Sequence, residues 1–165
     1  MWRPRAAIAA LILVLTIAPA AQAATPGSAT QVTGGWTWVN TGATFEPLPD
    51  GSLLISGTEE GTWSGSFRGS STDVFQMTQT PPVDDPVHWG PGWGTLTASF
   101  HGKVGVKNGT MTMHITFWWA ADDPIYHGTW EILSGTGALK HVTGSGTWVS
   151  GVDASATYAG TVYWK

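Results

Sequence analysis

The stretch Gly94–Trp119, GTLTASFHGKVGVKNGTMTMHITFWW, decides the fold because its apolar and polar residues alternate with a period of two. This alternation is typical of β-strands that bury one face and expose the other. The sequence therefore predicts two neighbouring strands here, and no helix. The apolar set expected to point inward is Leu96, Ala98, Phe100, Val104, Val106, Met111, Met113, Ile115, Phe117 and Trp119.

A tight turn is expected between these two strands. Asn108–Gly109 suits a two-residue type I′ turn, in which both central residues need a positive φ. A turn centred there would place Val104 opposite Met113 and Phe100 opposite Phe117. Both apolar sets then lie on one face of the hairpin, so the turn and the alternation agree.

The rest of the chain shows the same alternation and no 3.6-residue apolar period of useful length. The further predicted strands are Val32–Asn40, Glu60–Arg68, Ser71–Thr78, His127–Ser134, Thr143–Ser150 and Ser155–Trp164, with a short additional one at Leu53–Ser56 as an alternative. One apolar face per strand and mostly short connections favour a closed sheet. We therefore expect an all-β fold: a single eight-stranded antiparallel up-and-down β-barrel over residues 32–165.

Composition excludes several classes of protein. The 165 residues carry a formal net charge of −4 and no cysteine, which excludes disulfides, thiolate metal sites and a cysteine nucleophile. Lysine and arginine total only seven, too few for the basic surface of a nucleic-acid-binding protein. Eleven tryptophans point instead to an aromatic interior.

The N-terminus is predicted to be a secretory signal peptide over residues 1–23. Arg3 and Arg5 precede an apolar run over 6–18, and Ala21-Gln22-Ala23 forms an A-x-A cleavage site. The apolar run is shorter than the roughly 20 residues that span a bilayer, so we expect no stable membrane anchor. Residues 24–31 are expected to be a flexible lead-in, and the processed protein to be secreted or extracytoplasmic.

Ser134-Gly135-Thr136-Gly137-Ala138-Leu139, followed by Gly144-Ser145-Gly146, resembles a glycine motif of the allene oxide cyclase-like barrel superfamily, which includes the dirigent proteins. Within that calycin-like superfamily, the chain is most similar to small bacterial barrel proteins of unknown function. The resemblance covers roughly Gly34–Trp164. It implies an eight-stranded barrel with an apolar lumen, in which Leu139 plugs one end.

The resemblance does not supply a catalytic set. Plant allene oxide cyclases are associated with a lumen glutamate, a cysteine and an asparagine-held water, and this chain has no cysteine. Dirigent proteins use lumen aspartate and arginine, whereas Arg68 here is predicted at a hairpin tip. Some bacterial relatives are cyclases that mainly confine a flexible substrate in an apolar cavity, which needs few polar residues.

The candidate ligand-binding residues are those predicted to line the lumen. Aromatic walls can bind an apolar or aromatic molecule by stacking, and ordinary core packing is the alternative for the same residues. The candidates are Trp36, Trp38, Trp63, Gln76, Phe100, Met113, Phe117, Trp130, Trp148 and Tyr158.

One end of the barrel is predicted to be acidic. In an up-and-down barrel the connections 41–59, 79–92, 120–126 and 151–154 share an end, which collects most of the acidic residues, Glu59 among them. Arg68, Lys107 and Lys140 should gather at the other end. The candidate mouth residues are Asp84, Asp85, His88, Trp89, Asp122, Asp123, Tyr126 and His127.

The mouth has two interpretations. Two Asp-Asp-Pro segments are typical turn sequences that keep loops soluble. Alternatively, they attract a cation or supply acid–base groups. We predict no cofactor and no dedicated metal site, because Asp-Asp-Pro matches no known ligand spacing.

The sequence leads to a secreted barrel that binds a small apolar or aromatic molecule in its lumen. A cofactor-free isomerase or cyclase is the second hypothesis, and a packed structural or interaction barrel the third. A lumen cavity of roughly 300 Å³ or more would favour the first two. A polar pair with perturbed pKa values inside it would favour the enzyme.

Overall fold

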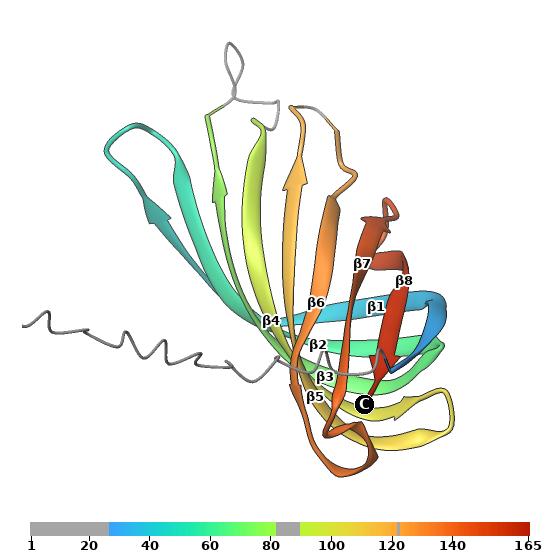
Figure 1. The fold of residues 1–165 in the computed structure, drawn as a ribbon. Coiled ribbons are helices and arrows are strands. Elements are labelled where there is room, and N and C mark those ends of the chain that lie inside the picture. The colour runs from blue at the N-terminus through green and yellow to red at the C-terminus, as the bar shows by residue number, and fades with distance from the viewer. Residues whose placement is uncertain (1–26, 82–89, 122) are drawn as a thin grey trace, which may run out of the picture.

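The computed structural model describes residues 27–81, 90–121 and 123–165. It contains eight β-strands and one short 3₁₀-helix, η1 (Gly137–Leu139) (Figure 1). The strands are β1 (Ser28–Pro47), β2 (Leu53–Gly65), β3 (Phe67–Gln79), β4 (Gly92–Val104), β5 (Lys107–Trp119), β6 (His127–Gly135), β7 (Val142–Ser150) and β8 (Ser155–Trp164). No helix among the described residues is long and apolar enough to cross a bilayer.

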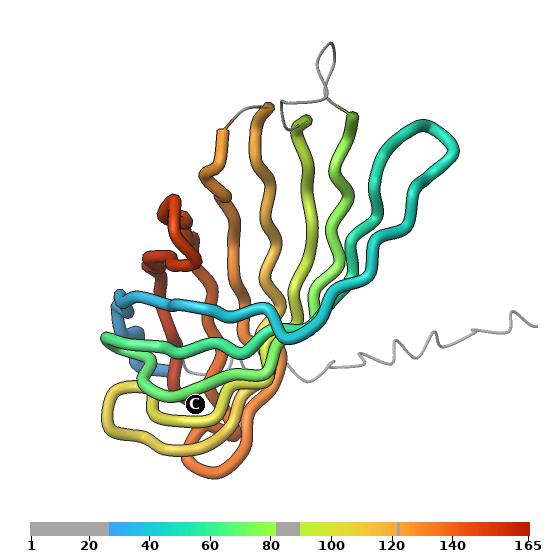
Figure 2. The backbone as a smooth tube through the Cα atoms, turned by 180° about the vertical axis from the view of Figure 1, so that it is seen from behind, coloured from blue at the N-terminus to red at the C-terminus, as the bar shows by residue number. Residues whose placement is uncertain are grey.

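The strands form a closed ring in chain order. Each strand pairs antiparallel with the next, and β1 pairs with β8. The predicted all-β, eight-stranded up-and-down fold is confirmed. The ring is not evenly round one axis: the upper ends of β1 to β6 spread like a fan, whereas β7 and β8 do not reach as high (Figures 1 and 2).

The predicted β4–β5 turn is wrong in position. Val104 pairs with Lys107, so the turn consists of Gly105 and Val106, with Gly105 at φ +61°. Val106 is therefore 92% exposed and not inward. Asn108 lies inside β5, where it pairs with Lys103.

The faces of the β4–β5 hairpin are nevertheless as predicted. Phe100 pairs with Met111 instead of Phe117. The register therefore differs from the predicted one by six residues. Because six is an even number and side chains alternate with a period of two, the same side chains stay on the buried face. Phe100, Val104, Met111, Met113 and Ile115 are all buried, as the alternation predicted. Phe117 is partly buried and packs against the core.

Three strands, β1, β2 and β3, are clearly longer than expected. β1 begins at Ser28, so residues 28–31 of the expected lead-in are paired with β8. The expected signal peptide lies outside the described residues. β2 runs from Leu53 to Gly65, so it includes the additional short strand at Leu53–Ser56. The predicted strand Glu60–Arg68 is wrong at its end, because Phe67 and Arg68 already belong to β3.

The lower half of the lumen is filled by side chains. Phe67 stacks on Tyr158 with ring centroids 4.9 Å apart, and Trp130 meets Phe67 edge-on at 5.5 Å. The Trp130 indole lies over Gly146 and Gly160, where a Cβ atom would approach it to 2.7 and 2.4 Å. These glycines leave the space that the indole occupies.

The Tyr158 hydroxyl joins three strands inside this packed half. It accepts a hydrogen bond from the Phe67 amide at 2.8 Å and donates one to the Ser64 carbonyl at 2.9 Å. We expect Tyr158→Phe to lower the free energy of unfolding by about 1–3 kcal/mol, because it leaves buried backbone groups unpaired. Denaturant unfolding measures this loss. Tyr163→Phe is the control, since Tyr163 is 43% exposed, and an equal loss in both variants would contradict the expectation.

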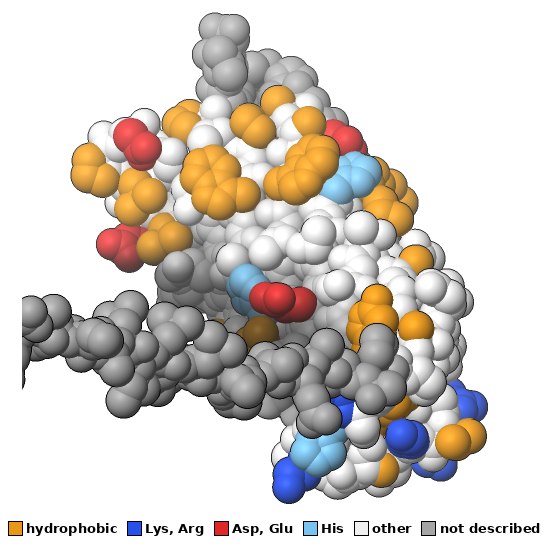
Figure 3. Space-filling model, viewed as in Figure 1, with side chains coloured by type: hydrophobic (Ala, Val, Ile, Leu, Met, Phe, Trp, Pro, Cys, Tyr) orange, Lys and Arg blue, Asp and Glu red, His pale blue; other side chains and the backbone are white. Residues whose placement is uncertain are grey.

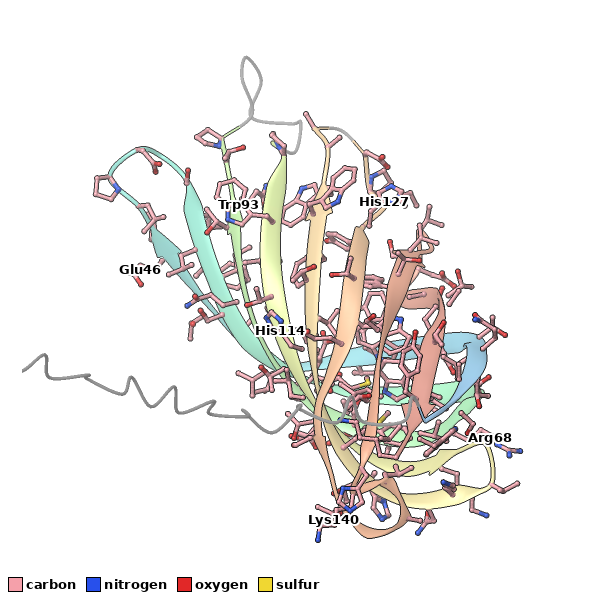
Figure 4. All side chains as sticks on the ribbon, viewed as in Figure 1. Glu46, Arg68, Trp93, His114, His127 and Lys140 are labelled. Atoms are coloured by element: carbon pink, nitrogen blue, oxygen red, sulfur yellow. The ribbon has the colours of Figure 1, made fainter. Side chains whose placement is uncertain are left out.

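Lysine and arginine side chains of the described residues gather at the lower end of the barrel (Figure 3). Arg68 and Lys140 lie there, with Glu46, Trp93 and His127 in the upper part (Figure 4). Leu139, at the end of η1, is fully buried, as a plug would be.

Candidate functional site

A cavity of about 100 Å³ lies in the upper half of the lumen. We call it the aromatic pocket. Its lining comes from β1 to β5, β7 and the segment after β5: Trp36, Trp38, Asn40, Glu59, Phe75, Met77, Leu96, Phe117, Tyr126 and Trp148. Most of these side chains are apolar or aromatic, and Glu59 is the only carboxylic acid among them.

Contacts between rings hold the walls in place. Trp36 stacks on Trp63 with centroids 5.0 Å apart and planes 8° from parallel. Trp38 and Trp148 pack against Trp36 at 4.9 and 5.6 Å. The Trp148 indole donates a hydrogen bond to the Thr116 carbonyl at 3.1 Å, which fixes its orientation. The walls are therefore arranged before any ligand arrives.

Tyr126 is anchored to β7. Its backbone amide donates to the Ser150 hydroxyl at 2.8 Å, and its carbonyl accepts from the Ser150 amide at 2.9 Å. Its ring meets Phe117 edge-on at 6.0 Å. The residue predicted at the mouth thus becomes part of the pocket wall.

Glu59 lies on the inner face of β2 and is 5% exposed. Burial raises the pKa of its carboxyl to about 8, and the Asp73 carboxylate adds to the shift. A carboxylic acid with such a pKa is mostly protonated at neutral pH. Burial and the negative charge of Glu59 also raise the pKa of Tyr126.

Asp73 is the register partner of Glu59 on β3 and is fully buried. Neither of its carboxylate oxygens has a hydrogen-bond partner among the described residues. Burial raises the pKa of Asp73 to about 6, and the neighbouring Ser71 hydroxyl opposes the shift. Burying a carboxyl group without a hydrogen-bond partner lowers the stability of the folded protein. Such a group therefore indicates a functional role or a partner that binds from outside the chain.

Gly61 leaves a polar niche beside Glu59 and Asp73, which we call the acid pair. A Cβ atom on Gly61 would lie 2.4 Å from Ser71 Oγ, 2.6 Å from Trp36 Nε1 and 3.1 Å from Asp73 Oδ2. The Ser71 hydroxyl accepts a hydrogen bond from Trp63 Nε1 at 2.9 Å, whereas Trp36 Nε1 is buried without a partner. Hydrogen-bonding capacity is therefore left unused next to the pocket.

The structure divides the predicted lumen residues into two groups. Trp36, Trp38, Phe117 and Trp148 line the aromatic pocket. The deeper ones pack the closed lower half: Trp63, Phe100, Met113, Trp130 and Tyr158. Their burial does not test whether they bind a ligand.

Gln76 is the exception, and its predicted lumen position is wrong. The side chain is exposed and donates to the Ser56 hydroxyl at 3.3 Å on the outer surface. Phe75 and Met77 face inward in its place.

Most of the predicted mouth cannot be placed, because Asp84, Asp85, His88, Trp89 and Asp122 lie outside the described residues. Asp123 accepts a hydrogen bond from the Ile125 amide at 2.9 Å, as a turn residue does. His127 stacks on Trp118, whose side chain is 53% exposed, on the outer surface. Among the described residues, no three potential metal-ligating side chains gather at one point.

Sequence reasoning missed the acid pair. Glu59 was assigned to a mouth loop, but β2 already starts at Leu53. The available signal was the alternation in β3: if Phe75 and Met77 face inward, so does Asp73. Because Gln76 was expected in the lumen instead, Asp73 was expected to face outward.

The comparisons with known proteins bear on the fold alone. No family model and no curated protein matches the chain. A solved structure of a protein of unknown function from the DUF3224 family of Shewanella oneidensis MR-1 is similar, with a TM-score of 0.67 and 16% sequence identity. The match covers 84% of this chain and 98% of that one. The chain is thus similar to a small bacterial β-barrel-like protein, and its site must be interpreted from its own residues.

Proposed function

We propose that this protein binds a small apolar or aromatic molecule in the aromatic pocket. The observation that supports this proposal is a cavity with orientated aromatic walls and with unpartnered polar groups beside it. Packed cores rarely leave both apolar space and buried polar atoms unused at one place. A secreted or extracytoplasmic location, which the N-terminal sequence predicts, is compatible with ligand capture.

The size of the cavity restricts the ligand. The cavity of about 100 Å³ does not reach the roughly 300 Å³ that was expected above for a ligand-binding lumen, and at which pockets for drug-sized molecules begin. It is nearer to the roughly 150 Å³ engineered cavity that accepts benzene. The ligand is therefore a molecule with one ring, or the ring-sized end of a longer molecule.

The binding test uses benzyl alcohol, which has one ring and one neutral polar group. We expect it to shift the indole N–H resonances of Trp36 and Trp148 in NMR spectra. Trp38→Ala removes one wall and should weaken binding by about tenfold, roughly the effect of losing one aromatic contact. Trp93→Ala is the matched control, because Trp93 is 55% exposed on the outer surface.

Two results would contradict the proposal. One is an unchanged spectrum at millimolar benzyl alcohol. The other is equal weakening by Trp38→Ala and Trp93→Ala, which would place the ligand outside the pocket. Either result would favour the packed structural barrel.

A cofactor-free isomerase in the same pocket is the second candidate. The observation that favours it is the Glu59–Asp73 pair, because a carboxyl group with a pKa of about 8 is suited to general acid–base catalysis near neutral pH. Binding is preferred here, since the pocket has little room for a substrate that changes shape.

A further inference from the structure

The acid pair specifies the chemistry of the ligand. This inference rests on the proposed binding function. We infer that the ligand carries a primary or secondary ammonium group, which the carboxyl group of Glu59 receives in the wall of the aromatic pocket, with the buried carboxyl group of its register partner Asp73 behind it. Its apolar part lies among the tryptophan and phenylalanine walls.

The first argument is the balance of donors and acceptors. Both Asp73 oxygens are buried without partners among the described residues, and the Glu59 side chain is only 5% exposed. The donors beside their four oxygens are Trp36 Nε1, the Ser71 hydroxyl, and the O–H of Glu59 while that carboxyl keeps its proton. Acceptors therefore outnumber donors, and a group with several N–H bonds and a positive charge supplies what is missing.

The second argument is that the described part of the chain supplies no cation to the pair. No lysine, arginine or histidine lines the pocket. Arg68 is at the lower end of the barrel and donates to the Gly105 carbonyl at 3.0 Å. Buried carboxyl groups without a charged partner in the protein are the receptor expected for a cationic ligand.

The third argument comes from the walls. Tryptophan, tyrosine and phenylalanine rings attract organic cations through their π faces, and this attraction increases in a desolvated site. Trp36, Trp38 and Tyr126 present such rings around Glu59. A metal ion would instead require further oxygen or nitrogen ligands, and no such group of three exists among the described residues.

Binding is therefore coupled to protons. The titratable groups that face Glu59 are Asp73 on β3 and Tyr126 after β5, with the neutral Asn40 on β1. Because the carboxyl of Glu59 keeps its proton up to about pH 8, an arriving ammonium group must displace that proton. Affinity for an amine should rise as the pH increases from about 6 to about 8.

The experiment compares benzylamine with benzyl alcohol, which have the same shape and differ in the ammonium and hydroxyl groups. We expect benzylamine to bind about tenfold more tightly at about pH 8, with proton release detected by calorimetry in buffers of different ionisation enthalpy. In Glu59→Gln and Asp73→Asn the preference should fall to about threefold or less. Both variants keep the side-chain shape and remove a carboxyl group that can become negatively charged.

Glu60→Gln is the matched control, because Glu60 is the next residue of β2 and faces solvent. It should keep the full preference for the amine. Equal binding of amine and alcohol, or an unchanged preference in Glu59→Gln and Asp73→Asn, would overturn the inference and leave the binding function intact. Binding of neither compound would overturn both.

Discussion

The Glu59→Gln variant is expected to be more stable than the wild type at pH 9 and equally stable at pH 4. Burial raises the pKa of Glu59 in the folded protein to about 8 from 4.5 in the unfolded chain. Between these values the folded state keeps the proton and the unfolded chain releases it, so rising pH favours unfolding. One pKa unit corresponds to about 1.4 kcal/mol, so the gain in free energy of unfolding should be about 2–5 kcal/mol.

Thermal or denaturant unfolding from pH 4 to pH 9 measures this effect. The wild type should lose stability with rising pH and level off above about pH 8, whereas Glu59→Gln should lose much less. Asp73→Asn should act in the same direction over a lower window, up to about pH 6. Glu60→Gln, which changes a solvent-facing residue, should follow the wild type. If the profiles of stability against pH were parallel for all variants, the expectation would be wrong, and water would reach Glu59 freely.

Phe67→Ala is expected to cause a large loss of stability, about 3–5 kcal/mol. Phe67 is fully buried and its ring contacts Tyr158, Trp63, Phe100 and Trp130. Removing it leaves a cavity that these rigid rings cannot close. Denaturant unfolding gives the loss directly.

The matched control for this variant is Phe45→Ala. Phe45 is 64% exposed on β1, so its loss should change the free energy of unfolding by about 0.5 kcal/mol or less. Similar losses for the two variants would show that Phe67 is not central to the packed half.

Much of the fold could be predicted because period-two alternation reports directly which face is buried. The faces of β4 and β5 are correct even though Asn108–Gly109 misplaced the turn, since the register error is an even number of residues. Alternation cannot fix the position of the turn. Gly105–Val106 and Asn108–Gly109 are both suitable turn sequences, and the pairing along the whole hairpin decides between them. Alternation also cannot show where the strands spread apart.

The site could be predicted only in part, for a physical reason. Tryptophans and phenylalanines are expected inside, so Trp36, Trp38, Phe117 and Trp148 were identified. Buried carboxyl groups contradict the expectation that acids are exposed. Glu59 was placed in a loop because the connection expected over residues 41–59 included it. Only the register of β2 with β3 shows that Glu59 and Asp73 share an inward row.

The ring of strands also has a consequence for how the chain folds. Along the described chain, every pairing except one joins consecutive strands and closes across a single connection. The exception is the seam between β1 and β8, where Ser28 pairs with Trp164 and partners such as Gln31 and Thr161 are 130 residues apart. Loop-closure entropy therefore opposes this seam more than any other pairing. The meander can grow hairpin by hairpin, and the lumen, with its acid pair, is sealed from water only when the first and last strands meet.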